Sequence, residues 1–142
     1  MILTDANVLI YAFRRDANRH EEYRAWLERV IAEETAFGVA DLVLSAVVRI
    51  TTHPRVFARP STLDEALVFC SFLLGLPNAV RVAPGVRHWE LFADICRKSH
   101  ARGNLITDAY LAALAMEAGA EWVTTDRDFA RFPGLRWRHP LG

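Results

Sequence analysis

Short apolar segments alternate with longer amphipathic ones along this chain, and this alternation limits the fold more than any other feature of the sequence. We expect strands at Ile2–Thr4, Phe37–Val39, Val80–Val82 and Trp122–Thr124, with a short fifth strand at Leu135–Trp137. Segments of helical periodicity separate these strands, and signals for hairpin turns are rare. Strands that alternate with helices predict an α/β fold built on a parallel sheet.

The segments between the strands carry helical patterns with recognisable starts and stops. Ser61 or Thr62 is a candidate cap, and Gly119 stands where a glycine ends a helix. The chain has 142 residues, of which 52% are hydrophobic, and it shows no repeat or linker, so we expect one globular domain over residues 1–142. The helices are expected at Asn7–Phe13, Glu21–Ala32, Leu42–Thr51, Thr62–Leu74, His88–Ala101 and Thr107–Ala118.

Membrane and secretory segments are not expected. The longest uncharged run, Ala66–Val80, is broken by Gly75 and Pro77 and is shorter than the roughly 20 residues that a spanning helix needs. The first residues lack the basic segment of a secretory signal. Cys70 and Cys96 have no metal-ligand spacing and lie in apolar segments, so buried free thiols and a cytoplasmic location are expected.

The charge balance bears on the type of partner. Lys and Arg total 17, as do Asp and Glu, and a net charge of zero is weak evidence against a nucleic-acid partner. If several acids gather in one site, however, the remaining surface is basic. Lys98 is the single lysine, and arginine suits phosphate recognition through its planar fork, although a coding bias explains the same excess more simply.

Three aspartates stand where a parallel sheet places its ligand site. Asp5 directly follows the first strand, Asp126 follows the fourth, and Asp108 lies in the first turn of an alanine-rich helix. Each alone could be a helix N-cap. Together, at the carboxyl edge of one sheet, they favour a shared site. Carboxylate oxygens select Mg²⁺ or Mn²⁺, and such ions support hydrolysis of phosphodiesters.

Several motifs resemble those of a known family. The segment Asp5–Tyr11 resembles the N-terminal signature of PIN domains, Thr107–Ala115 their third-acid helix, and Thr124–Phe129 their fourth-acid loop. The segments Arg49–Phe57 and Phe132–Trp137 resemble a mycobacterial-type branch of VapC toxins. The resemblance covers nearly the whole chain, with the motifs in order.

The resemblance implies a doubly wound central parallel sheet of four to five strands flanked by helices. It also implies a Mg²⁺-dependent endoribonuclease, with Mn²⁺ able to substitute, that acts as a toxin by inhibiting translation and growth. The implied partners are RNA, a second copy of the chain, a cognate VapB-type antitoxin and, only through that antitoxin, operator DNA. Asp5, Asp108 and Asp126 carry over as catalytic, metal-binding acids, and Asp128 as a further metal ligand.

Polar residues near these acids are candidates for orienting them or for binding RNA. Arg49 either holds an RNA phosphate or pairs with an aspartate. The others are helix-capping or acid-orienting candidates. The set is Arg49, Asn104, Thr107, Thr124, Thr125 and Ser45.

One departure from the family pattern concerns its usual glutamate in the helix after the second strand, which we place at Ala46. No acid occurs between Leu42 and Pro60, and Asp41 lies about 140° away around the helix. Ser45 or an ordered water would have to fill the gap.

Three other functions are therefore weighed: a metal-impaired RNA-binding protein on the PIN fold, a PIN nuclease of RNA processing that is not a toxin, and a phosphatase with Asp5 as nucleophile. The phosphatase also needs a lysine, and Lys98 is not placed to serve.

Overall fold

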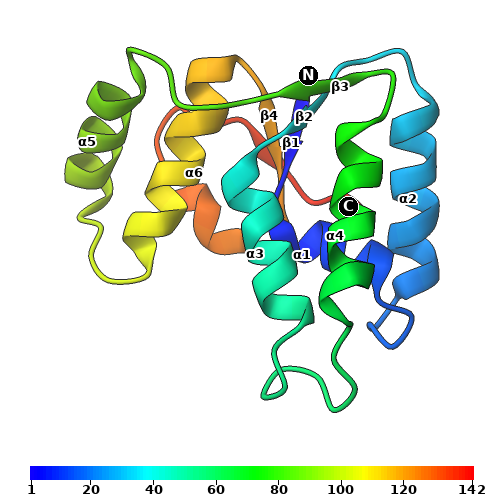
Figure 1. The fold of residues 1–142 in the computed structure, drawn as a ribbon. Coiled ribbons are helices and arrows are strands. Elements are labelled where there is room, and N and C mark those ends of the chain that lie inside the picture. Colours follow the sequence, from blue (N-terminus) through cyan, green and yellow to red (C-terminus); the bar gives the residue numbers. More distant parts are fainter.

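A five-stranded parallel sheet forms the centre of the protein in a computed structural model that describes residues 1–142 (Figure 1). The strands follow the order β3-β2-β1-β4-β5, and every neighbouring pair is parallel. The α/β fold with a parallel sheet, predicted from the alternation of segments, is confirmed. The strands are β1 (Ile2–Thr4), β2 (Phe37–Val39), β3 (Ala79–Arg81), β4 (Glu121–Val123) and β5 (Trp137–Arg138).

The order of the strands reverses direction at β1. The chain moves from β1 to β2 and β3 in one direction, then returns past β1 to form β4 and β5 on its other side. In such sheets the ligand site lies beyond the carboxyl ends of the strands where the order reverses. Here that point is the junction of β1 and β4, where Thr4 aligns with Val123.

Six α-helices connect the strands and begin and end within two residues of their predicted bounds, whereas the short 3₁₀-helix between β4 and β5 was not predicted. The clearest difference is α6, which begins two residues before the predicted Thr107. Asn104, the residue before it, makes no side-chain cap. Because the helix begins at Leu105, Thr107 and Asp108 lie inside it. The helices are α1 (Ala6–Phe13), α2 (His20–Ala32), α3 (Asp41–Thr51), α4 (Leu63–Leu74), α5 (His88–Ser99), α6 (Leu105–Ala118) and η1 (Arg127–Arg131).

Several smaller expectations are also settled. Thr62 caps α4 in a reciprocal capping box with Glu65, and Gly119 ends α6 at a φ of 67°. β3 and β4 each begin and end one residue earlier than predicted, and β5 is Trp137–Arg138 rather than Leu135–Trp137. Strand ends are set by hydrogen bonds to the neighbouring strand, which the pattern of one segment does not contain.

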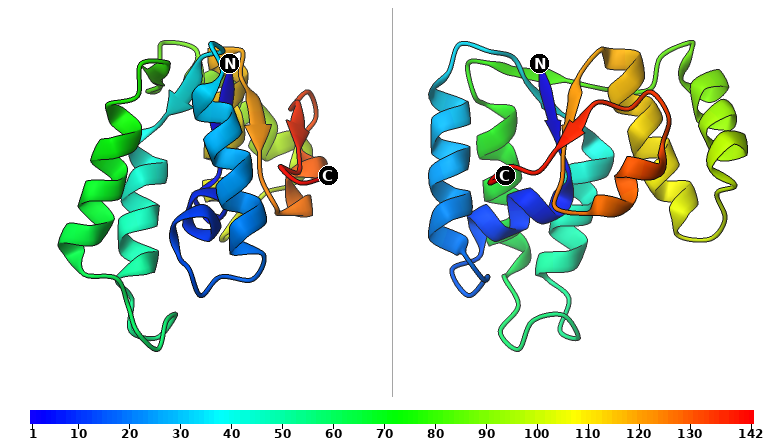
Figure 2. Two further views of the ribbon diagram at one scale, coloured as in Figure 1. Left: turned by 90° about the vertical axis from the view of Figure 1, so that its right-hand side faces the viewer. Right: turned by 180° about the vertical axis from the view of Figure 1, so that it is seen from behind.

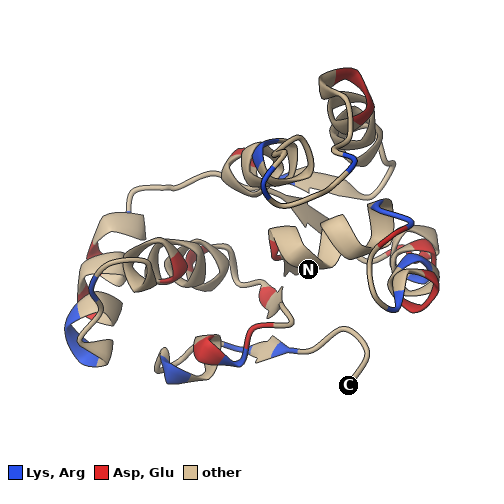
Figure 3. Cartoon of the chain, turned by 90° about the horizontal axis from the view of Figure 1, so that it is seen from below, with Lys and Arg blue, Asp and Glu red and all other residues tan.

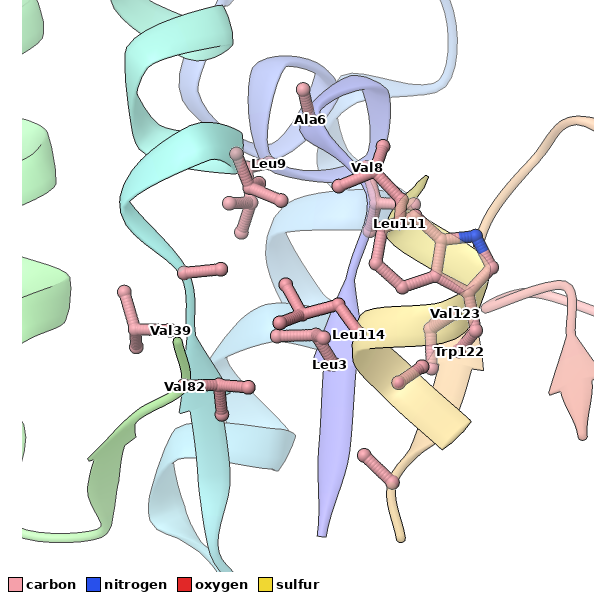
Figure 4. Close-up of a cluster of buried hydrophobic side chains, with 14 of the residues drawn as sticks. Leu3, Ala6, Val8, Leu9, Val39, Val82, Leu111, Leu114, Trp122 and Val123 are labelled. Atoms are coloured by element: carbon pink, nitrogen blue, oxygen red, sulfur yellow. The ribbon is translucent and has the colours of Figure 1, made fainter. Parts of the chain in front are cut away.

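The core lies between the sheet and the helices on its two faces. Figure 4 shows α6 in front of the central strands and α2 behind them, with Leu3, Trp122 and Leu114 among the side chains between the layers. The alanines of α6 let this helix approach the sheet closely, and Ala109, Ala112, Ala113 and Ala115 are all fully buried.

Tight packing also explains a glycine in β2. A Cβ at Gly38 would lie 2.9 Å from the backbone oxygen of Ile2, so β1 and β2 pair at this register only with a glycine there.

The remaining helices lie around this centre. The two views of Figure 2 show α3 and α4 side by side, while α5 packs against α6 at the far side of the molecule. No helix is long and apolar enough to span a membrane. Both cysteines are free; Cys70 is buried as expected, and Cys96 is only partly so.

Candidate active site

The hydroxyl of Thr124 joins the two strand-end aspartates. Thr124 is fully buried, and its Oγ1 donates a hydrogen bond of 2.7 Å to Oδ2 of Asp5. The same oxygen accepts a bond of 3.0 Å from the backbone N–H of Asp126. The backbone N–H of Asp5 in turn donates to the carbonyl oxygen of Val123 at 2.9 Å. The ends of β1 and β4 are therefore held together by one side chain and one backbone hydrogen bond.

Asp5 caps α1, as the capping alternative predicts, but it does more than cap. Its Oδ1 accepts from the backbone N–H of Ala6 at 2.7 Å, while Oδ2 binds Thr124. Burial raises the pKa of Asp5 above its ordinary value, and the hydrogen bonds from Thr124 and Ala6 oppose that shift. The carboxyl group is thus fixed in orientation within a poorly solvated place.

Asp126 begins η1 and has a similar double role. Its Oδ1 accepts from the backbone N–H of Asp128 at 2.8 Å, so it caps the 3₁₀-helix. Asp128 is exposed and forms an ion pair of 3.5 Å with Arg131 on the next turn. Asp128 is therefore the outermost of the four acids.

Asp108 differs from the other two because no hydrogen bond accounts for its position. It is the fourth residue of α6, beyond the first turn's capping positions. Its pKa is raised to about 6, first by burial and then by the negative charges of Asp126, Asp5 and Asp128. The positive charge of Arg131 opposes this shift. A carboxylate whose pKa is strongly raised by burial and by neighbouring charges is a marker of a functional site.

The three predicted acids are therefore brought to one edge of the sheet, but their side chains are not gathered around a point. No group of three acidic, histidine or cysteine side chains is arranged to hold a metal ion as it stands. Asp5 and Asp126 each use an oxygen for a helix cap. Like charges also repel, so uncompensated carboxylates stay apart.

The donor set nevertheless suits a hard divalent cation. The candidate ligands are all carboxylate oxygens, and an oxygen that caps a helix keeps a second lone pair for a metal. No lysine or arginine forms an ion pair with Asp5, Asp108 or Asp126. The unbalanced negative charge that raises the pKa of Asp108 is the charge that such an ion would neutralise.

Of the polar residues predicted to assist, the structure gives a bonded role only to Thr124. Asn104 precedes α6 without capping it, and Arg49 is exposed and pairs with no carboxylate, so the ion-pair alternative for Arg49 does not hold. Ser45 is exposed on α3. No side-chain hydrogen bond from Thr107 or Thr125 to the acids is present, and their roles stay predictions.

No other acid of the chain takes the place of the glutamate that the family usually has at the position of Ala46. Ala46 is half-buried in α3. The side chain of Asp41 is directed away to form an ion pair with Arg81 of β3. Asp41 therefore does not replace the missing acid, as the 140° separation predicted.

Sequence reasoning missed Arg131. It is the cation whose charge acts on Asp108, and it also pairs with Asp128. The signal was present in the sequence, because Asp128 and Arg131 are three residues apart and a single helical turn brings such residues together.

The raised pKa of Asp108 predicts a measurable effect on stability. The folded protein binds a proton at Asp108 more tightly than the unfolded chain does, so Asp108 costs stability once the pH rises through about 6. In metal-free protein at pH 8, Asp108→Asn should raise the free energy of unfolding by about 1–2 kcal/mol, a value reduced for partial exposure. The gain should vanish near the unfolded pKa of about 4.

Denaturant unfolding at several pH values measures this effect. Asp128→Asn is the control, because it removes the same charge from an exposed neighbour and should change stability less. Equal stability of Asp108→Asn and the wild type at pH 8 would contradict the electrostatic account.

Comparison with known proteins agrees with this geometry. The PIN domain family model matches residues 2–135. Ribonuclease VapC43 of Mycobacterium tuberculosis is 45% identical over 141 residues, covering 99% of this chain and 96% of that protein. Ribonuclease VapC25 of the same organism is 39% identical over 140 residues and 99% of each chain.

Solved structures share the fold at lower identity. VapBC2 of Rickettsia felis, solved with a promoter DNA fragment, has a TM-score of 0.72 and 17% identity over 98% of each chain. VapC20 of Mycobacterium tuberculosis, described as a toxin that cleaves the sarcin-ricin loop, has a TM-score of 0.64 and 14% identity over 96% of this chain and 99% of that one. With a family model that spans nearly the whole chain, relatives at 45% identity and the predicted acids at one sheet edge, the chain belongs to the VapC ribonucleases of the PIN-domain family.

Proposed function

We propose that the protein is a Mg²⁺-dependent endoribonuclease that acts in the cytoplasm as the toxin of a toxin–antitoxin pair and halts growth by cutting an RNA needed for translation. The observation that carries the proposal is the environment of Asp108. Its side chain is half-buried and forms no ion pair, and the negative charges of three other aspartates act on it. A nuclease site that recruits a divalent cation needs such a concentration of negative charge.

Asp5, Asp108 and Asp126 would hold the ion, and Asp128 would add charge at its outer side. A divalent ion at that place would withdraw electrons from the scissile phosphate and make water a stronger nucleophile at neutral pH. The chain's own contribution is positional. Thr124 fixes Asp5 relative to Asp126, and the close packing of α6 on the sheet fixes Asp108.

Arg131 is placed to support the reaction from the open side of the site. It is half exposed and pairs with Asp128 at 3.5 Å, a loose contact that a phosphate oxygen can replace. When RNA is bound, its guanidinium can bind the phosphate whose charge grows during cleavage.

The first test is cleavage itself. Purified protein should cut RNA in Mg²⁺ or Mn²⁺ and stop on addition of EDTA. Asp108→Asn should reduce the rate at least about 100-fold, since it removes a charged ligand of the ion but keeps the side chain's shape.

Mapping the fragments of total RNA by sequencing measures the rate and the cut sites together. Equal cleavage by the wild type and Asp108→Asn at saturating Mn²⁺ would exclude this site as the nuclease centre. RNA binding without cleavage by the wild type would instead favour the metal-impaired binding protein that Ala46 suggested.

A second test concerns Thr124 and needs no RNA. Thr124→Val removes the hydroxyl that bonds Asp5 and Asp126 and should weaken Mg²⁺ or Mn²⁺ affinity about 10–100-fold, the usual effect of losing a group that orients ligands. Thr124→Ser keeps the hydroxyl and should bind the ion almost as the wild type does.

Calorimetric titration with Mn²⁺ reports both variants, and thermal unfolding without metal shows whether each one is folded. A valine variant that binds Mn²⁺ as tightly as the serine variant would show that Thr124 has no role in positioning the acids.

Homodimerisation and an antitoxin partner are also part of the proposal. The outer face of α4 exposes Leu63, Leu67, Val68 and Phe72, and Phe72 is 51% exposed. An apolar helical stripe of this kind is typical of a surface that another chain covers. Binding to operator DNA would come only through the antitoxin, as the R. felis complex with promoter DNA contains both proteins of such a pair by its name.

We expect the isolated protein to be a dimer held by apolar contacts between helices. Sedimentation velocity at micromolar concentration should give a single species of twice the chain mass. The species should persist in high salt, because burial of apolar surface does not depend on ionic attraction. A monomer under these conditions would contradict the expectation.

A further inference from the structure

The connection between α3 and α4, residues 52–62, extends past the end of the sheet where the active site lies. In Figure 1 it forms the lowest part of the molecule, on the side toward which β1 runs. It is internally ordered: the backbone N–H groups of Val56 and Phe57 donate to the carbonyl oxygen of His53, and that of Ser61 donates to the carbonyl oxygen of Thr51 at 2.8 Å. We call this connection the α3–α4 loop.

Arg14, at the end of α1, holds this loop in place. It is only 9% exposed, and its Cζ lies 4.0 Å from the centre of the Phe57 ring. Nη1 donates to the hydroxyl of Ser61 at 3.0 Å, while Nε and Nη2 donate to Asp16 at 2.9 and 2.6 Å. The loop is therefore fixed at both its middle and its end by a nearly buried guanidinium.

The charges that the loop presents to solvent are unpaired and positive. Arg55 and Arg59 are exposed, and neither forms an ion pair. The acidic side chains nearby already have other partners and do not neutralise these arginines. Asp16 binds Arg14, and the carboxylate of Glu65 accepts a hydrogen bond from the backbone N–H of Thr62. Asp64 lies in the first turn of α4, where the positive end of the helix dipole attracts it.

Other arginines without a carboxylate partner lie at the same end of the molecule. In the view from that end, basic segments lie near the central acidic ones, and further acidic segments lie at the rim (Figure 3). Zero net charge therefore does not describe the neighbourhood of the site, where arginines without a carboxylate partner lie near the central acids. The arginines in question are Arg15, Arg49, Arg55, Arg59, Arg102 and Arg127.

The distance between the loop and the site indicates what kind of ligand would contact both. Asp5 caps the first residue of α1 and Arg14 follows its last, so the eight residues of α1 separate them by about 12 Å. Because Arg14 holds the loop at Phe57 and Ser61, Arg55 and Arg59 belong to a segment anchored at that distance from Asp5, on one side of the site. A flexible single strand whose phosphates repeat along its length meets both the site and the loop at once.

We propose that the α3–α4 loop is an RNA-binding element in which Arg55 and Arg59 bind phosphates of the substrate strand outside the cleavage point. Arg14 is a positioning residue, because it holds the loop and its guanidinium is occupied by Asp16, Ser61 and Phe57. The inference rests on the proposed nuclease function and adds where the substrate strand runs.

The experiment measures RNA binding apart from cleavage. Every variant carries Asp108→Asn so that the RNA stays intact, and the probe is a labelled oligouridylate long enough to span the site and the loop. The loop variant is Arg55→Gln with Arg59→Gln. The matched control is Arg29→Gln with Arg87→Gln, which removes two exposed, unpaired arginines in the last turn of α2 and just before α5, at the other end of the molecule.

The dependence of the affinity on salt distinguishes contact from position. Each phosphate contact with a single strand contributes a slope of about 0.7 in log K against log salt, so the loop variant should lose about 1–1.4 and the control almost nothing. Arg14→Gln should weaken binding but keep most of the slope, since Arg55 and Arg59 remain and only their order is lost. Thermal unfolding confirms that each variant is folded.

Equal salt slopes in the loop variant and the control would overturn the inference. So would a loop dependence that appears with an oligoglutamate peptide but not with RNA, which would make the loop a protein-docking surface. A parallel assay of RNA cleavage without Asp108→Asn separates the two proposals. If the wild type cuts RNA but the loop arginines do not matter, only the inference fails; if they matter for binding but nothing is cut, only the nuclease function fails.

Discussion

The pairing of β1 with β4, closed by the hydroxyl of Thr124, is the constraint on which the site depends. These strands are far apart in the sequence, and the aspartates that follow them meet only because Thr4 aligns with Val123. A slip of one residue would turn the side chain of Thr124 to the other face of the sheet and separate Asp5 from Asp126. The buried hydroxyl, which bonds to both ends, is satisfied only in the observed register.

The periodicity of apolar residues, together with the residues that start and end helices, was enough to predict the strands, the parallel sheet and the two aspartates at its edge. A strand followed directly by an aspartate is visible along the chain, and parallel strands present their ends at one edge. The start of α6 was predicted two residues late because Thr107 and Asp108 have the composition of a helix start. The helix instead begins at Leu105, where packing rather than a cap stabilises the first turn.

The missed features are contacts between distant segments. Arg14 contacts Ser61, 47 positions along the chain, and nothing near either residue indicates the partner. Asp128 and Arg131 could have been paired by spacing alone, but the action of Arg131 on Asp108 depends on the approach of η1 to α6. The net charge also misled, because a total of zero contains no information about where the unpaired arginines lie relative to the central acids.

The three acids differ in how far hydrogen bonds compensate their negative charges in the folded protein. Asp5 and Asp126 each cap a helix start and are joined through Thr124, so hydrogen bonds offset part of the cost of holding these acids together without a metal, although burial still leaves the pKa of Asp5 raised. Asp108 has no such compensation and is held against repulsion by the packing of α6, whose alanines are fully buried. A site composed only of capping acids would gain little from a cation. The charge of Asp108 therefore couples ion binding to stability most directly, because an ion that neutralises it removes an electrostatic penalty that no hydrogen bond offsets.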